Sequence, residues 1–216
     1  MIKACIFDLD GTLLYTISNI TYHINSTLEK YGVEGVDEKT CISLLGKGAR
    51  NLLERIFDRR GVLAPSLRDE MFDAFLKAYN ADPNCLVSPY EGIPELIDEL
   101  ISRGVKLAVV SNKPHPATIS SIDLFFGGKF DLVLGSREDV PLKPAPDSCR
   151  EVFAAFSVTP DEVMFIGDSE VDVYTARNIS AGKGVAVTWG YRTREELAAS
   201  GAELFADTPA QILELL

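Results

Sequence analysis

Ala4-Cys5-Ile6-Phe7-Asp8-Leu9-Asp10-Gly11-Thr12 is the stretch of sequence that decides the fold. Its first four residues form an unbroken apolar run, which the two aspartates and the glycine then end. A short apolar run of this kind, bounded by polar and turn residues, predicts a strand that is buried on both faces. Similar runs follow much later in the chain, at 107–110, 132–134, 163–166 and 185–187.

Helical patterns separate these runs. Apolar residues at i, i+3, i+4, i+7 and i+8 precede the second run, and Gly104 follows them as a helix stop. Strands that alternate with helices favour an α/β fold with a doubly wound parallel sheet. The residues that carry this pattern are Ile93, Leu96, Ile97, Leu100 and Ile101.

The stretch from 15 to 87 breaks the alternation, because it has helical spacing throughout and no strand-like run. We expect an all-helical insertion of three or four helices after the first strand, with residues 1–14 and 88–216 forming the α/β core. Pro83 and Pro89 flank the return of the chain and predict a hinge. The apolar positions are Ile20, Ile24, Leu28 and Tyr31, then Leu52, Leu53, Ile56 and Phe57, then Phe72, Phe75, Leu76 and Tyr79.

Composition and charge exclude several classes of protein. Of the 216 residues, 46% are hydrophobic and 25% are charged, so the chain can bury a core without disulfides. Twenty-one Lys and Arg against 32 Asp and Glu leave a net charge of 21 − 32 = −11, which makes nucleic acid and anionic membranes poor partners. No apolar run is long enough for a membrane helix, and the N-terminus resembles a strand rather than a signal peptide. We therefore expect a cytoplasmic protein.

Cysteine and histidine are too sparse and too scattered for a zinc site. The four cysteines have no CxxC spacing, so we expect free, mostly buried thiols. His23 and His115 are the only histidines, and packing or surface roles are expected for both. Any metal should therefore be a hard cation that oxygen atoms bind.

Polar groups gather where the predicted strands end. The carboxyl ends of parallel strands meet at one edge of a sheet, which is where ligands bind in such folds. A lysine between two prolines lies shortly before the fourth long run, in a loop that the prolines stiffen. The groups concerned are Asp8 and Asp10, Ser111, Asn112 and Lys113, Asp168 and Asp172, and Lys143.

The charges of these groups predict a cation. If the four aspartates converge, up to four negative charges face one ammonium group, that of Lys143. Carboxylates a few ångströms apart repel, so one must bind a proton or all must share a cation. Mg2+ fits because it needs few protein carboxylates and keeps its waters. A phosphate ester could then be the missing ligand, neutralised by Mg2+ and Lys143 together.

The same residues, in this order, resemble the haloacid dehalogenase superfamily of aspartate-nucleophile phosphatases. Its four motifs correspond to 8–12, Ser111, Lys143 and 167–172, and the helical insertion resembles the family's cap domain. Within the superfamily the chain is most similar to phosphoglycolate phosphatases. The segments that carry this narrower resemblance are 46–48, 89–92 and 188–192.

The resemblance implies a mechanism. Asp8 would attack phosphorus and form an aspartyl-phosphate, while Asp10 would protonate the leaving alcohol and then activate water. The side chains of Asp8 and Asp168 and the backbone carbonyl of Asp10 would bind Mg2+. Ser111 and backbone N–H groups near Asn112 would bind the phosphoryl oxygens. Lys143 would neutralise the phosphoryl charge, and Asp172 would hold Lys143 or a metal-bound water.

Two features of the insertion permit different interpretations. Lys47 and Arg50 could reach a substrate carboxylate when the cap closes, or could be an exposed pair at the start of a helix. The stripe of Phe72, Phe75 and Tyr79 is expected to be helix core rather than part of a cofactor site.

Three functions remain open on the sequence alone. The first is a Mg2+-dependent phosphatase for a small phosphorylated metabolite. The second is a phosphomutase of the β-phosphoglucomutase type, which would use the same catalytic residues. The third is a non-catalytic phosphate-binding protein, against which the intact Asp8 and Asp10 speak. Either a monomer or a homodimer is compatible with the sequence.

Overall fold

The computed structural model describes the whole chain, Met1–Leu216, and is built around a six-stranded sheet in which every pair of neighbouring strands is parallel. This confirms the predicted doubly wound α/β fold. The sequence did not predict the short last strand. In spatial order the strands are β5 (Leu132–Ser136), β4 (Lys106–Pro114), β1 (Ala4–Phe7), β6 (Val163–Gly167), β7 (Lys183–Val187) and β8 (Leu204–Ala206).

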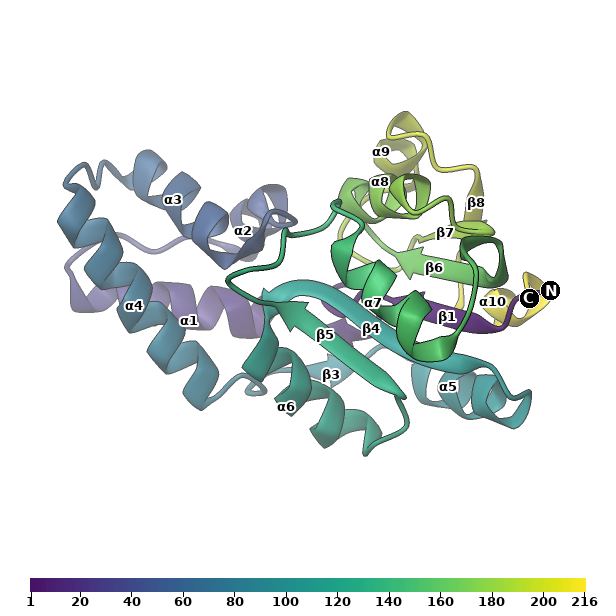
Figure 1. The fold of residues 1–216 in the computed structure, drawn as a ribbon. Coiled ribbons are helices and arrows are strands. Elements are labelled where there is room, and N and C mark those ends of the chain that lie inside the picture. The colour runs from purple at the N-terminus through teal and green to yellow at the C-terminus, as the bar shows by residue number, and fades with distance from the viewer.

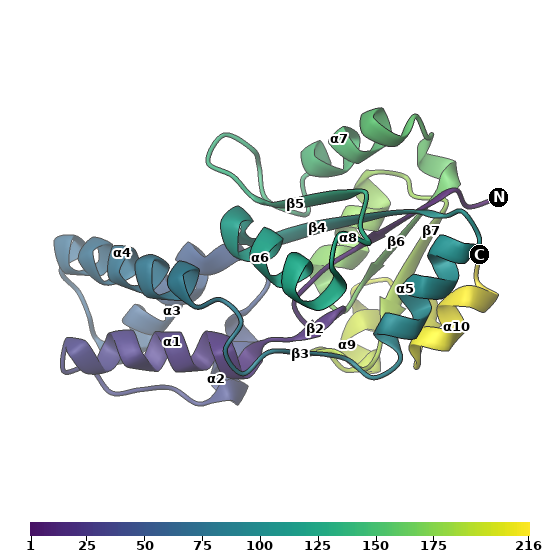
Figure 2. The same ribbon diagram turned by 90° about the horizontal axis from the view of Figure 1, so that it is seen from below.

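Helices cover both faces of the sheet, which is why the central strands are apolar without interruption. In β1, Cys5 and Phe7 belong to one hydrophobic cluster, and Ala4 and Ile6 to the cluster on the opposite face. Figure 2 shows α7 (Asp147–Phe156) on one side of the sheet and α5 (Ile93–Ser102) with α10 (Pro209–Glu214) on the other. The first cluster includes residues of α5, α6 (His115–Phe126) and α10, and the second includes residues of α7 and α8 (Glu170–Asn178).

The predicted insertion, residues 15–87, contains four helices that pack around a hydrophobic cluster, which also includes Ala117 of α6. It lies beyond one end of the sheet, while both chain termini lie at the other end (Figure 1). The antiparallel pair β2 (Leu14–Tyr15) and β3 (Ser88–Pro89) joins it to the sheet. A hinge at Pro83 and Pro89 remains a prediction. The helices are α1 (Ile17–Lys30), α2 (Glu38–Leu44), α3 (Gly48–Arg60) and α4 (Pro65–Ala81).

The cysteines and histidines have the packing environments that the sequence predicts. All four cysteines are free and three are buried, as predicted. His23 is buried and packs edge-on against Tyr79, whereas the ring of His115 accepts a hydrogen bond from the backbone of Gly135. None of the helices combines the length and the apolar character that crossing a bilayer requires. The elements that complete the fold are the short 3-10 turn η1 (Pro160–Glu162) and helix α9 (Arg194–Ala199).

Candidate active site

Three of the four aspartates that the sequence predicts to converge meet at the carboxyl edge of the sheet. Asp8 follows β1, Asp168 follows β6, and Asp172 lies in the first turn of α8. One carboxylate oxygen from each lies within 4.8 Å of the others, and both Asp168 and Asp172 are buried. Because strands β1 and β6 are adjacent and parallel, their ends bring the first two aspartates together. The trio is a set of hard oxygen donors of the kind that binds a divalent cation.

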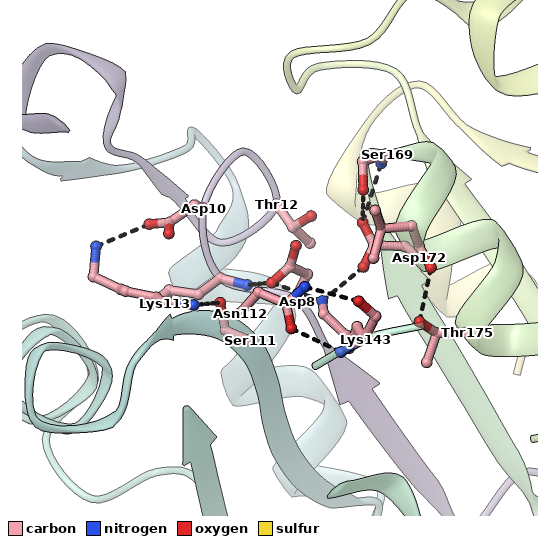
Figure 3. A network of polar contacts seen from close by, with 12 residues as sticks. Asp8, Asp10, Thr12, Ser111, Asn112, Lys113, Lys143, Ser169, Asp172 and Thr175 are labelled. Carbon is pink, nitrogen blue, oxygen red and sulfur yellow. Dashed lines mark hydrogen bonds and ion pairs between the residues drawn. The ribbon is translucent and has the colours of Figure 1, made fainter. Parts of the chain in front are cut away.

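Lys143 is the cation that pairs with this trio. Its Nζ lies 3.0 Å from Asp8 Oδ1 and 2.7 Å from Asp172 Oδ1, and its side chain is only 3% exposed (Figure 3). Burial alone would lower the pKa of Lys143, but Asp172 and Asp8 raise it above its ordinary value. Lys143 is therefore held as a charged ammonium group that bridges two carboxylates.

One ammonium does not balance three clustered carboxylates. Burial, then the neighbouring charge of Asp172, raise the pKa of Asp8 to about 7, although Lys143 opposes the shift. Burial, Asp172 and Asp8 likewise raise the pKa of Asp168 well above its ordinary value. The charged forms of these two groups are thus unfavourable in the protein alone, and a bound divalent cation would relieve the repulsion.

Backbone and hydroxyl donors fix the remaining carboxylate oxygens. Asp168 accepts hydrogen bonds from Thr12 Oγ1 at 3.2 Å and from the backbone N–H of Tyr191 at 2.8 Å. The turn before Tyr191 passes so close that a Cβ on Gly190 would lie 2.3 Å from the Asp168 side chain, so only glycine fits. Asp172 Oδ2 accepts from the backbone N–H and hydroxyl of Ser169, at 3.1 and 2.6 Å. These bonds leave Asp172 committed to Lys143 and Ser169, as a residue that positions Lys143.

Asp10 lies apart from the trio and has a lysine of its own, Lys113, to which the sequence assigned no role. Lys113, in β4, places its Nζ 3.0 Å from Asp10 Oδ1 and also donates a hydrogen bond to the Tyr79 hydroxyl. Figure 3 shows Asp10 turned toward Lys113 and away from the contacts of Asp8 with Lys143. Lys113 stands directly after the predicted phosphate-binding pair, and a lysine at the end of a buried strand was the signal that could have revealed it.

Ser111 and Asn112 have different environments. Ser111 is buried, and its hydroxyl oxygen accepts from the backbone N–H of Lys113 at 3.3 Å, which leaves the hydroxyl proton free to donate. The Asn112 side chain is instead fully used by the protein: it accepts from Lys143 N and donates to the carbonyls of Lys143 and Gly46. The Asn112 side chain is thus engaged within the protein, and the predicted contact of backbone N–H groups near Asn112 with the phosphoryl oxygens remains a prediction. Asn112 fixes the loop that carries Lys143.

Comparison with known proteins identifies the family. The family model for haloacid dehalogenase-like hydrolases matches residues 5–186. The chain belongs to the haloacid dehalogenase-like hydrolases. A phosphoglycolate phosphatase from Cereibacter sphaeroides is 35% identical over 190 residues, covering 87% of this chain and 85% of that protein. The structure of a predicted phosphoglycolate phosphatase from Haemophilus somnus superposes with a TM-score of 0.91 at 28% identity and covers 99% and 97% of the two chains.

A third relative carries a ligand. The structure of CbbY from Rhodobacter sphaeroides, solved in complex with phosphate, has a TM-score of 0.82 at 26% identity and covers 98% of this chain and 96% of that one. These comparisons confirm the predicted superfamily, the predicted fold and the prediction of an enzyme that resembles phosphatases.

In this haloacid dehalogenase-like hydrolase an open cavity lies between the sheet edge and the helical insertion. Its floor includes Asp8, Asp10 and Ser111, whereas helices α1, α3 and α4 supply mostly apolar wall residues. Phe75 and Tyr79 belong to the hydrophobic cluster of the insertion, as predicted, and they also line this cavity.

Lys47 and Arg50, the two basic residues of the insertion that the sequence singles out, do not line the cavity. Lys47 is exposed. Arg50 pairs with Asp69 at 2.9 Å, which favours the structural interpretation of that residue. The wall cation that the sequence reasoning missed is Arg192, which pairs with Glu170 and donates to the carbonyls of Ile42 and Leu45 at the end of α2. A contact of Lys47 with substrate remains a prediction.

The hydrolase should lose stability when Lys143 is replaced by methionine. The substitution keeps the apolar stem but leaves buried carboxylates without their cation, which typically costs about 3–5 kcal/mol. Urea unfolding in the presence of EDTA measures the difference. The matched control is Lys106→Met. The Lys106 side chain is 56% exposed, so its pair with Asp131 should contribute less than about 1 kcal/mol to the free energy of unfolding. Equal losses in the two variants would contradict a buried charge network at Lys143.

Proposed function

We propose that this protein is a Mg2+-dependent phosphatase that hydrolyses a small phosphorylated metabolite, with 2-phosphoglycolate as the first candidate. The observation that carries the proposal is the cluster of Asp8, Asp168 and Asp172, of which the last two are buried, with Lys143 as its ammonium partner. The similarity to phosphoglycolate phosphatases over most of the chain supports both the reaction and the candidate substrate.

The residues present fit a magnesium ion. Asp8 and Asp168 offer carboxylate oxygens, and their repulsion in a buried site is what a divalent cation would reduce. When bound, Mg2+ would supply charge stabilisation for the phosphoryl group. The backbone carbonyl of Asp10 is the proposed third protein ligand.

The side chains of the protein divide the chemistry between them. Asp8 would attack phosphorus with a carboxylate oxygen, and the bond from phosphorus to the alcohol oxygen would break as an aspartyl-phosphate forms. Asp10 would give its proton to the leaving alkoxide and then take a proton from the water that hydrolyses the intermediate. Lys143 and the Ser111 hydroxyl would stabilise the phosphoryl oxygens throughout.

We also propose that residues 15–87 act as a cap that seals this reaction from bulk water. Support comes from the cavity, whose floor is charged and whose opposite wall is formed by the apolar residues of the insertion, among them Ile20, Leu52 and Phe75. Exclusion of water strengthens the charge interactions at the floor and prevents side reactions.

The test is phosphate release from a panel of about a hundred phosphorylated metabolites, with p-nitrophenyl phosphate as a general probe. We expect Mg2+-dependent release of free phosphate, with small alkyl phosphates such as 2-phosphoglycolate among the best substrates. A panel without release from any compound would overturn the proposal. Formation of an isomeric sugar phosphate with little free phosphate would show a mutase instead.

Removal of the metal should abolish activity and lower stability. A ligand present at 100 times its dissociation constant stabilises the folded state by about 2.7 kcal/mol, which is roughly 5–10 °C for a chain of this size. Thermal unfolding with and without Mg2+ measures this independently of turnover. Asp168→Asn is the comparison, since it should reduce the Mg2+-induced shift, and an undiminished shift in that variant would place the metal elsewhere.

A further inference from the structure

A lysine joins the proposed acid–base residue to the helical insertion. The side chain of Lys113 is only 1% exposed, and its Nζ lies between the carboxylate of Asp10 and the hydroxyl of Tyr79. Asp10 belongs to the loop after β1 and Lys113 to β4, whereas Tyr79 belongs to α4 of the insertion. The three side chains therefore form a polar bridge from the sheet edge to the proposed cap.

Tyr79 is a rigid member of this bridge. Its ring stacks on Phe75, with centroids 5.3 Å apart, and meets the ring of His23 edge-on at 5.4 Å. The side chain is almost fully buried. A side chain packed on two sides has few alternative rotamers, so its hydroxyl offers Lys113 one fixed position.

Each of the two aspartates of the predicted catalytic motif has its own lysine. Lys143 pairs with Asp8, and Lys113 pairs with Asp10. Lys113 is thus distinct from Lys143, the ammonium group proposed to bind phosphate. Its Nζ contacts Asp10, the side chain proposed to protonate the leaving alcohol. The Asp10 side chain, 18% exposed, has no other hydrogen bond or ion pair in the structure, so this contact is what fixes its orientation.

We propose that Lys113 and Tyr79 are positioning residues that hold the Asp10 carboxyl group where it serves the leaving alcohol. The proposal rests on the phosphatase function proposed above. It makes the placement of Asp10 depend on α4, because Tyr79 fixes Lys113 and Lys113 fixes Asp10. A misplacement of a catalytic group by about 1 Å can cost about a hundredfold in rate, which is how such a distant hydroxyl acts on turnover.

The leaving group provides the test. An alkoxide needs a proton from Asp10, whereas p-nitrophenolate leaves as a stable anion and needs little help. The constant kcat/KM covers the steps through departure of the alcohol, so it reports this proton transfer. The test compares kcat/KM of Tyr79→Phe and of Lys113→Met with that of the wild type, using the best alkyl phosphate of the panel and p-nitrophenyl phosphate. The matched control is Tyr22→Phe, a tyrosine of α1 that is 52% exposed.

For Tyr79→Phe, the fold-decrease in kcat/KM should be about ten times larger with the alkyl phosphate than with p-nitrophenyl phosphate. For Lys113→Met this ratio should be larger still. Tyr22→Phe should show no difference between the substrates. Equal losses on both substrates, or no loss, would overturn the positioning role while the phosphatase proposal stands. A wild type inactive on both substrates would overturn the phosphatase proposal and this one with it.

A double variant separates positioning from loss of folding. If Tyr79 acts only through Asp10, Tyr79→Phe should cause no further loss on the alkyl phosphate in an Asp10→Ala background. A full additional loss in that background would overturn the proposal, because the hydroxyl would then act independently of Asp10.

Discussion

Replacing Asp8 by asparagine should lower kcat by roughly 10⁴–10⁶-fold, because the substitution removes the proposed nucleophile and leaves only binding and charge stabilisation. Asparagine keeps the shape of the side chain, so the pocket and the neighbouring Lys143 contact should be little changed. Steady-state phosphate release with Mg2+ and the best substrate of the panel measures the loss.

The same variant should not lose stability in the absence of metal. Burial and the Asp172 charge disfavour the ionised form of Asp8, so a neutral side chain at this position relieves repulsion. Urea unfolding in EDTA gives the comparison with the wild type, and an unchanged or higher free energy of unfolding assigns the loss of turnover to chemistry. Turnover at the wild-type rate would show that Asp8 is not the nucleophile.

Replacing Asp10 by alanine should lower kcat for an alkyl phosphate by roughly 10²–10⁴-fold, the range that general acid–base catalysis contributes. KM should change much less, because Asp10 is assigned to proton transfer rather than to binding. The loss in kcat/KM should be smaller with p-nitrophenyl phosphate, whose leaving group needs no proton.

Steady-state kinetics with the two substrates measure this loss. Asp98→Ala is a suitable control, since Asp98 pairs with Lys129 on the exposed surface of α5. A higher KM at unchanged kcat would contradict the acid–base assignment and make Asp10 a binding residue instead.

The sequence could predict the sheet and the acidic edge because both depend on local patterns. Strands buried on two faces are apolar without interruption, and Asp8 and Asp168 follow directly from where two such strands end. Strand β8 was missed because Leu204–Ala206 is a three-residue edge strand of which only Ala206 is buried. Such a short segment has no pattern that distinguishes it from a loop.

The contacts between distant parts of the chain could not be predicted. Asn112 bonds to Gly46, 66 positions away, and Lys113 bonds to Tyr79, 34 positions away. No periodicity encodes which side chain of a helix faces which strand end after folding. The same limit explains why the sequence assigned no role to Lys113.

The most direct test of the account is to trap the covalent intermediate. The enzyme is mixed with its best substrate and Mg2+, quenched in acid during turnover, digested, and mapped by mass spectrometry. We predict one added phosphoryl group on the peptide that contains Asp8, assigned to the Asp8 side chain and absent from Asp8→Asn. Phosphate release at full rate with no phosphoryl group on Asp8, or with the group on another residue, would contradict the account.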